Sequence, residues 1–167
     1  MPASNSANPS LPVTFRPVSP EDEEFLFALY ASTRKEELAQ WGWPQARQQA
    51  FLALQFKAQR RQYLAQFPEA AHSLLILDGA PIGRLWVDRA NSIRLVDITL
   101  LPERQHQGLG TSLIQLLQAE AAACSKPLEL SVLKSNVRAL RLYQRLGFAI
   151  AADGGMYLAM IFPPKPA

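Results

Sequence analysis

An apolar run, a loop with two glycines and the start of a helical pattern follow one another between residues 95 and 111. The apolar run is Leu95–Leu101, the loop reads QHQGLG over Gln105–Gly110, and the helical pattern begins at Thr111. The first N–H groups of a helix lack partners within the helix, and the helix dipole adds partial positive charge there. Glycines have no Cβ, so an anion can approach their backbone closely. The pattern therefore predicts an α/β chain with a phosphate site at this helix start.

The rest of the chain alternates between the two-residue period of strands and the longer period of helices. Helices are expected over residues 20–32, 45–67, 108–123 and 136–146, and strands over 13–18, 73–77, 81–88, 93–101, 128–133, 148–151 and 156–162. Thr33–Pro44 is charged and aromatic together, which is typical of a loop between two helices or of a segment that lines a cleft. The order predicts a mixed α/β layout with no internal repeat.

A chain of 167 residues is the size of one domain with one substantial core. We expect that domain to span residues 13–162. Residues 1–12 are rich in Ser, Asn, Ala and Pro, and residues 163–167 are rich in Pro, so both ends are predicted to be disordered tails.

Composition excludes several classes of protein. A net charge of +3 is too small and too scattered to predict nucleic-acid binding, although it suits an anionic cofactor. The single cysteine, Cys124, rules out an internal disulfide, and neither His72 nor His106 has the spacing of a metal site. No apolar run is long enough to predict a membrane span, so we expect a cytoplasmic protein without a metal.

Two common phosphate loops do not fit the glycine loop. A nucleotide triphosphatase loop requires a lysine after its last glycine, but Thr111 and Ser112 follow Gly110. A dinucleotide-binding loop requires a third glycine where this chain has Leu113. Glu129 does stand where such a loop would have its ribose-binding acid, but several strands that look antiparallel precede the loop.

A third kind of loop fits, because two motifs resemble signatures of the GNAT N-acetyltransferases. Gln105–Gly110 fits Gln/Arg-x-x-Gly-x-Gly/Ala, and Asn136–Phe148 is similar to Asn-x-x-Ala-x-x-Leu-Tyr-x-x-x-Gly-Phe. The motifs stand in the family's order, with 25 residues between Gly110 and Asn136. The resemblance implies the GNAT acyl-CoA N-acyltransferase fold, a mixed, mostly antiparallel sheet flanked by helices and splayed between strands 93–101 and 128–133.

The same resemblance implies acetyl-CoA as co-substrate and an N-acetyltransferase that passes the acetyl group to a primary amine directly in a ternary complex. The expected cofactor-binding residues are the phosphate loop, the strand before it and two residues of the second motif. They are Gln105, His106, Gln107, Gly108, Leu109, Gly110 and Thr111, then Ile98, Thr99 and Leu100, then Asn136 and Tyr143. Asn136 fits equally a helix N-cap.

The resemblance makes Tyr143 the general acid near the cofactor sulfur, and a buried core aromatic is the alternative. The general base has no clear match, since Ile93 and Arg94 occupy the region where relatives often have a glutamate. Asp97 is the candidate base, but it could equally be a structural acid paired with Arg84 or Arg94. A non-catalytic acyl-CoA sensor or scaffold with the same fold therefore remains the alternative function.

The acceptor is expected to be a small-molecule or peptide amine. Glu36 and Glu37 could attract a cationic amine, and Trp41 and Trp86 could stack on it; alternatively, these four residues are a helix-end acid pair and core aromatics. The second predicted helix is rich in glutamine, which favours a polar pocket over an open peptide groove. A homodimer is also a possible assembly.

Overall fold

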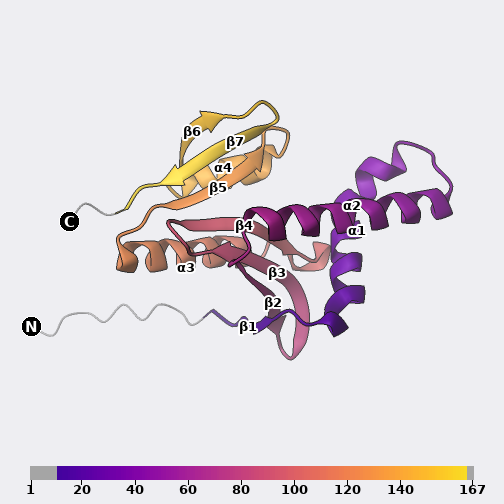
Figure 1. Ribbon diagram of the computed structural model, residues 1–167, viewed down its shortest axis with the longest axis horizontal. Coiled ribbons are helices and arrows are strands. Elements are labelled where there is room, and N and C mark those ends of the chain that lie inside the picture. The colour runs from indigo at the N-terminus through magenta and orange to yellow at the C-terminus, as the bar shows by residue number, and fades with distance from the viewer. Residues whose placement is uncertain (1–10, 165–167) are drawn as a thin grey trace, which may run out of the picture.

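A twisted seven-stranded sheet forms the centre of the protein in a computed structural model that describes residues 11–164 (Figure 1). The strand order is β1-β2-β3-β4-β5-β7-β6. The strands are β1 (Thr14–Pro17), β2 (Ala71–Leu77), β3 (Ala80–Asp88), β4 (Ile93–Leu100), β5 (Leu128–Leu133), β6 (Ala149–Asp153) and β7 (Tyr157–Phe162). Residues 1–10 and 165–167, most of the two predicted tails, lie outside the described part. Leu11, within the first predicted tail, packs against the core.

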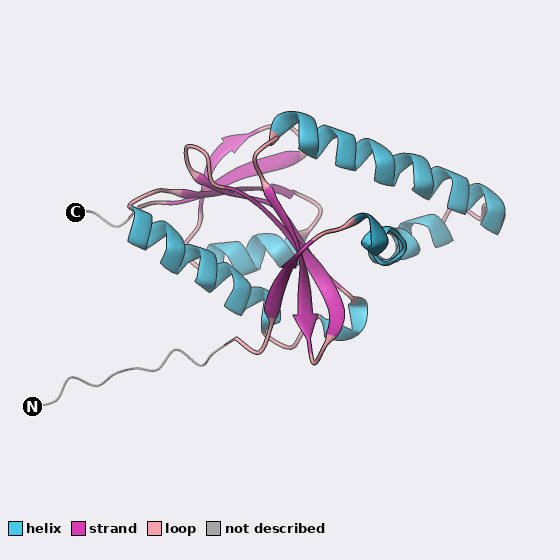
Figure 2. Cartoon of the chain, turned by 60° about the horizontal axis from the view of Figure 1, so that its bottom comes forward, coloured by secondary structure: helices cyan, strands magenta, loops and turns pink. Residues whose placement is uncertain are grey.

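Four helices cover the two faces of the sheet (Figure 2). They are α1 (Glu23–Ala39), α2 (Gln45–Gln66), α3 (Leu109–Cys124) and α4 (Val137–Arg145). Apolar residues of α3 and α4 pack with Leu75 and Leu85 in the larger core cluster, whereas those of α1 and α2 pack with Leu74 in a smaller one. Successive side chains of a strand point to opposite faces, so α1 and α2 lie on one face and α3 and α4 on the other.

β4 and β5 form the one parallel pair in the described sheet, and they part after three residues. Their pairing runs from Ile93 opposite Leu128 to Leu95 opposite Leu130. β5 stays paired with β7 along its whole length, and β4 stays paired with β3 up to Leu100. The second half of β4 therefore has no paired strand on its β5 side. The predicted fold, including the splay between these two strands, is confirmed.

A bulge in β4 decides which of its side chains face which helices. Trp86 lies opposite Asp97, but the next residue of β3, Val87, lies opposite Leu95, so Val96 is an extra residue in β4. A bulge shifts the in-and-out alternation of a strand by one residue. Ile98 consequently packs with the α3 and α4 core. Asp97 and Thr99 point to the face that α1 and α2 cover.

The first predicted helix is too short. The structure has a short 3-10 turn at Pro20–Asp22 and then α1, which continues through seven residues of the predicted loop to Ala39. Two local interactions stabilise the extension: Arg34 forms an ion pair with Glu37 one turn away, at 2.7 Å, and Leu38 is buried against the smaller core cluster. Predicted and observed boundaries of the second helix differ by one residue, at its end.

Candidate active site

The glycine loop leaves the start of α3 open. Gly108 has φ +79°, which favours glycine, and is the N-cap of the helix. The first intrahelical hydrogen bond runs from the Ser112 N–H to the Gly108 carbonyl at 3.0 Å, so the preceding N–H groups of Leu109, Gly110 and Thr111 have no helical partner. A Cβ built on Gly108 or Gly110 would meet no atom within 4 Å. The loop thus has both the donors and the space for a phosphate.

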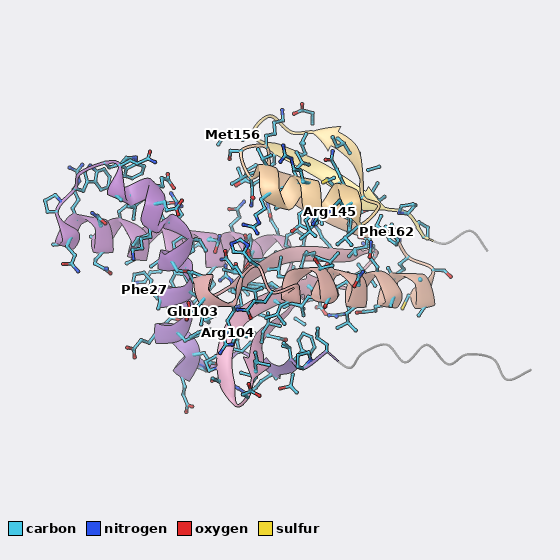
Figure 3. All side chains as sticks on the ribbon, turned by 180° about the vertical axis from the view of Figure 1, so that it is seen from behind. Phe27, Glu103, Arg104, Arg145, Met156 and Phe162 are labelled. Carbon is cyan, nitrogen blue, oxygen red and sulfur yellow. The ribbon has the colours of Figure 1, made fainter. Side chains whose placement is uncertain are left out.

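Side chains of the loop stabilise its shape. The Gln105 amide donates to the Leu100 carbonyl at 3.1 Å, and the Gln107 amide donates to the Glu103 carbonyl at 2.9 Å. Leu109 is buried in the core. Glu103 belongs to the turn between β4 and α3 (Figure 3). The part of the loop that remains free for an anion is therefore its backbone.

A cationic face of α4 adjoins this loop, which the sequence reasoning missed. Nη1 of Arg138 lies 2.9 Å from Nε2 of His106. Arg138, Arg141 and Arg145 are three and four residues apart, which places them on one side of the helix. All three are exposed, and none has an ion pair within the described residues. Arg145 ends the helix (Figure 3). The spacing of these three arginines within the second motif is the sequence signal that could have predicted this cationic face.

Asn136 and Tyr143 lie at the two ends of one helix, α4. The Asn136 side chain is the N-cap and accepts the Ala139 N–H at 3.2 Å. Tyr143 is 8 % exposed and packs against Phe148, with ring centroids 5.7 Å apart. Burial raises the pKa of Tyr143 to about 12, and the negative charge of Asp97 adds to the effect. The phenol is therefore protonated at neutral pH, and Asp97 lies near enough for its charge to act on it.

Asp97 is part of a polar network that crosses three elements. Its Oδ2 accepts from Arg84 Nε at 2.6 Å and from the Thr99 hydroxyl at 3.0 Å. Arg84 Nη2 in turn donates to Oε1 of Gln59 on α2, at 2.7 Å. Of the two partners expected for a structural acid, Arg84 is thus the actual one; Arg94 pairs with Glu129 instead. Oδ1 of Asp97 accepts no hydrogen bond from residues 11–164.

An aromatic stack lies beside this network. Tyr63 of α2 meets Trp86 edge to face, with centroids 5.1 Å apart, and Trp86 stacks on His72 at 3.9 Å. Trp86 is only 2 % exposed, so it supports Tyr63 from behind and offers almost no surface to a ligand. Burial, followed by the charge of Asp97, raises the pKa of Tyr63. Asp97 thus lies near two neutral phenols, Tyr63 on one face of the sheet and Tyr143 on the other.

Three of the residues predicted to bind the acceptor lie elsewhere. Glu36 and Glu37 are in the last turns of α1, and Trp41 is in the α1–α2 connection, where it packs with Trp43 and Phe51. This end of the helical hairpin projects from the body of the protein, away from β4 and β5 (Figures 1 and 2). The structure does not bring these three residues together with Asp97 or Tyr143.

The described residues contain neither a membrane-spanning helix nor a cluster of metal ligands. No helix within residues 11–164 is long and apolar enough to cross a membrane. Among the same residues, no group of three or more His, Cys, Asp or Glu side chains could hold a metal ion.

Gly110→Glu tests the loop directly. A glutamate fits the first turn of α3 without a clash, and its negative charge interacts favourably with the positive end of the helix dipole. The fold is therefore expected to remain stable. Its carboxylate would repel a phosphate at the same N–H groups, and like charges in contact cost several kcal/mol. We expect titration calorimetry to show coenzyme A binding at least about 100-fold more weakly. Ala123→Glu, at the far end of α3, is the matched control, and equal loss in both variants would contradict the assignment. Gly108→Glu is less suitable because of its positive φ.

The burial of His72 predicts that the folded protein loses stability in mild acid. Burial lowers its pKa from 6.5 to about 4, with the positive charges of Arg84 and Arg60 adding to burial and Asp22 opposing it. Between these two pH values His72 binds a proton in the unfolded chain but not in the folded one. The stability of the fold therefore falls as the pH drops from 6.5 to 4. We expect His72→Phe, which keeps the stack on Trp86, to reduce this loss by about 2 kcal/mol once partial exposure is allowed for. Chemical unfolding at about pH 7 and about pH 4.5, on either side of this titration, measures it; an unchanged difference between the two pH values would contradict the assignment.

The comparisons with known proteins agree with this arrangement. The sequence model of the acetyltransferase (GNAT) family matches residues 27–148. No curated protein sequence matches the chain. Among solved structures, the PaiA N-acetyltransferase of Thermoplasma acidophilum in complex with coenzyme A is 18 % identical, with a TM-score of 0.67 over 90 % of this chain and 98 % of that one.

Two further solved structures have the same fold. An acetyltransferase of Thermus thermophilus is 23 % identical, with a TM-score of 0.65 over 90 % of this chain and 96 % of that one. The ribosomal-protein-S18-alanine N-acetyltransferase of Escherichia coli is 21 % identical, with a TM-score of 0.58 over 93 % of this chain and 96 % of that one. With its glycine loop, its splayed sheet and the family match over most of its length, this chain belongs to the GNAT acetyltransferase family.

Proposed function

We propose that the protein is an N-acetyltransferase that moves the acetyl group of acetyl-CoA to a primary amine by direct transfer. The observation that carries the proposal is the open loop at the start of α3 beside the unpaired half of β4. The N–H groups of the loop suit the pyrophosphate of the cofactor. The free edge of β4 at Ile98–Leu100 suits its amide-containing arm, which would pair like an added strand. A similar structure that contains coenzyme A supports the choice of cofactor.

Acetyl-CoA would supply the acetyl group as a thioester, and this chain's residues would manage two protons. Asp97 has one free carboxylate oxygen that can take the proton of the attacking amine, directly or through water. Tyr143 holds a proton at its hydroxyl and can donate it as a hydrogen bond toward the sulfur. Since the pKa of Tyr143 is about 12 and that of a thiol is about 8.5, stabilisation of the departing thiolate by this hydrogen bond is the main contribution. Backbone N–H groups of β4 would stabilise the oxyanion.

Direct transfer is favoured over a covalent acetyl-enzyme because of the position of the one cysteine. Cys124 is in the last turn of α3, at the opposite end of the helix from the glycine loop. Cys124 comes fifteen positions after Leu109, which is a distance of about 22 Å along a helix. No thiol of the chain therefore lies near the reaction centre. A ternary complex in which the amine attacks the thioester needs none.

One observation favours the alternative of a non-catalytic acyl-CoA sensor: the candidate base, Asp97, already forms an ion pair with Arg84. Release of thiol from acetyl-CoA, measured across a panel of primary amines, separates the two functions. If the protein is an acetyltransferase, at least one amine should cause release of thiol, and the rate of release should increase with the amine concentration. Tight binding of coenzyme A by calorimetry, without release for any amine in the panel, would favour the sensor. Gly110→Glu, which should lose both, is the control for binding at the loop.

A further inference from the structure

Arg84 is an unusual residue for its position. It lies on the face of the sheet that α1 and α2 cover, between Leu74 of β2 and Thr99 of β4. Its side chain is 5 % exposed, and Asp22 is the one other buried charged residue in residues 11–164. Burying an ion pair costs several kcal/mol of desolvation, and apolar residues of similar size are often no less stabilising. Stability of the fold is therefore a poor explanation for an arginine here.

The contacts of Arg84 suggest a different role. Its Nε donates to Asp97 Oδ2 at 2.6 Å, and the Thr99 hydroxyl donates to the same oxygen at 3.0 Å. Two donors thus fix one oxygen of the carboxylate, and the other, Oδ1, has no partner within the described residues. The Asp97 side chain remains 17 % exposed, whereas Arg84 is almost fully enclosed. The arrangement orients the carboxylate and leaves half of its acceptor capacity free.

We propose that Arg84, held by Gln59, is a positioning residue that keeps the Asp97 carboxylate oriented with Oδ1 free to take the proton of the amine acceptor. This inference rests on the proposed acetyl transfer and adds the residues that make Asp97 fit for it. Arg84 touches neither acceptor nor cofactor in this account and acts through Asp97. The ion pair, offered above as a feature of a sensor, then becomes part of the catalytic machinery.

Gln59 connects this pair to the helix that lies over it. Its Oε1 accepts from Arg84 Nη2 at 2.7 Å, and Tyr63, one helical turn later, lies on the same side of α2. Tyr63 is near enough to Asp97 for the carboxylate to raise its pKa. An acceptor that packs against α2 next to Tyr63 would therefore meet the same helix that holds Arg84 in place. The glutamine-rich composition of α2 has one specific use here.

The groups near Asp97 come from four elements, and one of them, Tyr143, lies on the opposite face of the sheet. Arg84 comes from β3, Thr99 from β4 itself, Tyr63 from α2 and Tyr143 from α4. Burial raises the pKa of both tyrosines, so they are neutral at physiological pH, and Thr99 is uncharged. Arg84 is then the one charge among these neighbours. Arg84 is therefore the neighbour that can hold the carboxylate in one orientation by a charge-assisted hydrogen bond.

The test is the rate of acetyl transfer by Arg84→Met and by the matched control Arg94→Met, with kcat and the KM for acetyl-CoA measured separately. Arg94 is also an ion-paired arginine of the sheet, bound to Glu129, but it does not contact Asp97. We expect kcat of Arg84→Met to fall about tenfold or more, because the carboxylate that takes the proton is no longer oriented, while the KM for acetyl-CoA changes little. Arg84→Lys, which keeps a charged hydrogen-bond donor, should recover most of the lost rate. Arg94→Met should keep the wild-type rate.

Three results would overturn the proposal. They are a wild-type kcat in Arg84→Met, a loss in that variant that lies in the KM for acetyl-CoA and not in kcat, or an equal loss of kcat in Arg94→Met. If Arg84→Met does not fold, Gln59→Leu replaces it, since it keeps the charge and removes the support; unchanged kcat/KM there would contradict the positioning role. Absence of acetyl transfer by the wild-type protein would contradict the proposed function, whereas an active wild type with an unaffected Arg84→Met would contradict only the positioning role.

Discussion

Replacing Asp97 with asparagine is expected to lower kcat by about 100-fold or more at neutral pH, because an amide cannot take a proton from the attacking amine. Asparagine has nearly the shape of aspartate, and its oxygen can still accept from Arg84 and Thr99. The affinity for coenzyme A should change little, since the glycine loop is untouched. Steady-state rates at saturating acetyl-CoA and amine measure the first effect, and calorimetry measures the second.

The same variant carries a cost in stability. Arg84 would remain buried without a compensating charge, and breaking a buried pair in this way typically costs about 3–5 kcal/mol. Rates must therefore be measured well below the unfolding midpoint. Asp88→Asn, the same chemical change at the end of β3, is the matched control and should keep the wild-type rate. A folded Asp97→Asn variant whose kcat stays within about threefold of wild type, far less than a lost general base should cost, would remove Asp97 from the mechanism.

Replacing Tyr143 with phenylalanine is expected to lower kcat by about 100-fold, because the departing sulfur loses its hydrogen-bond donor. The fold should stay nearly as stable. The ring keeps its contact with Phe148, and no hydrogen bond of the hydroxyl occurs within residues 11–164, so little stability is lost. KM for acetyl-CoA should change much less than kcat, because the donor acts on the transition state.

Tyr30→Phe is the matched control for this variant. Tyr30 is also a buried tyrosine, and its hydroxyl accepts from Arg34, one turn further along α1, at 3.1 Å. Loss of that hydroxyl should leave kcat unchanged. A normal rate in Tyr143→Phe, or a loss of equal size in Tyr30→Phe, would return Tyr143 to the role of a core aromatic.

Most of the fold could be predicted from local sequence signals. Alternation, turn residues and the two motifs predict the strands, the glycine loop and the helix that follows it. The end of α1 could not be predicted, because Thr33–Leu38 carries charged residues with no apolar period. Its helical form depends on the Arg34–Glu37 pair and on burial of Leu38 against residues that are distant in sequence.

The site was only partly predictable, for a physical reason. The glycine loop and Tyr143 belong to continuous motifs, so their sequence carries the information. The sequence left Arg84 and Arg94 open as partners of Asp97. The pairing of β3 with β4 selects Arg84, and the packing of α2 on the sheet adds Gln59 and Tyr63. The bulge at Val96, which turns Asp97 toward them, has no mark in the residue pattern. Long-range contacts of this kind are invisible to periodicity.

Transfer of an isotope-labelled acetyl group from acetyl-CoA to a primary amine tests the central claim most directly. The protein is incubated with the labelled donor and with the amine that gives the fastest thiol release, and the products are identified by mass spectrometry. The account predicts one acetylated amine for each thiol released, with no label on the protein, and far slower formation of both by Tyr143→Phe. Thiol release without acetylated amine, or a labelled protein on the path to product, would contradict direct transfer at this site.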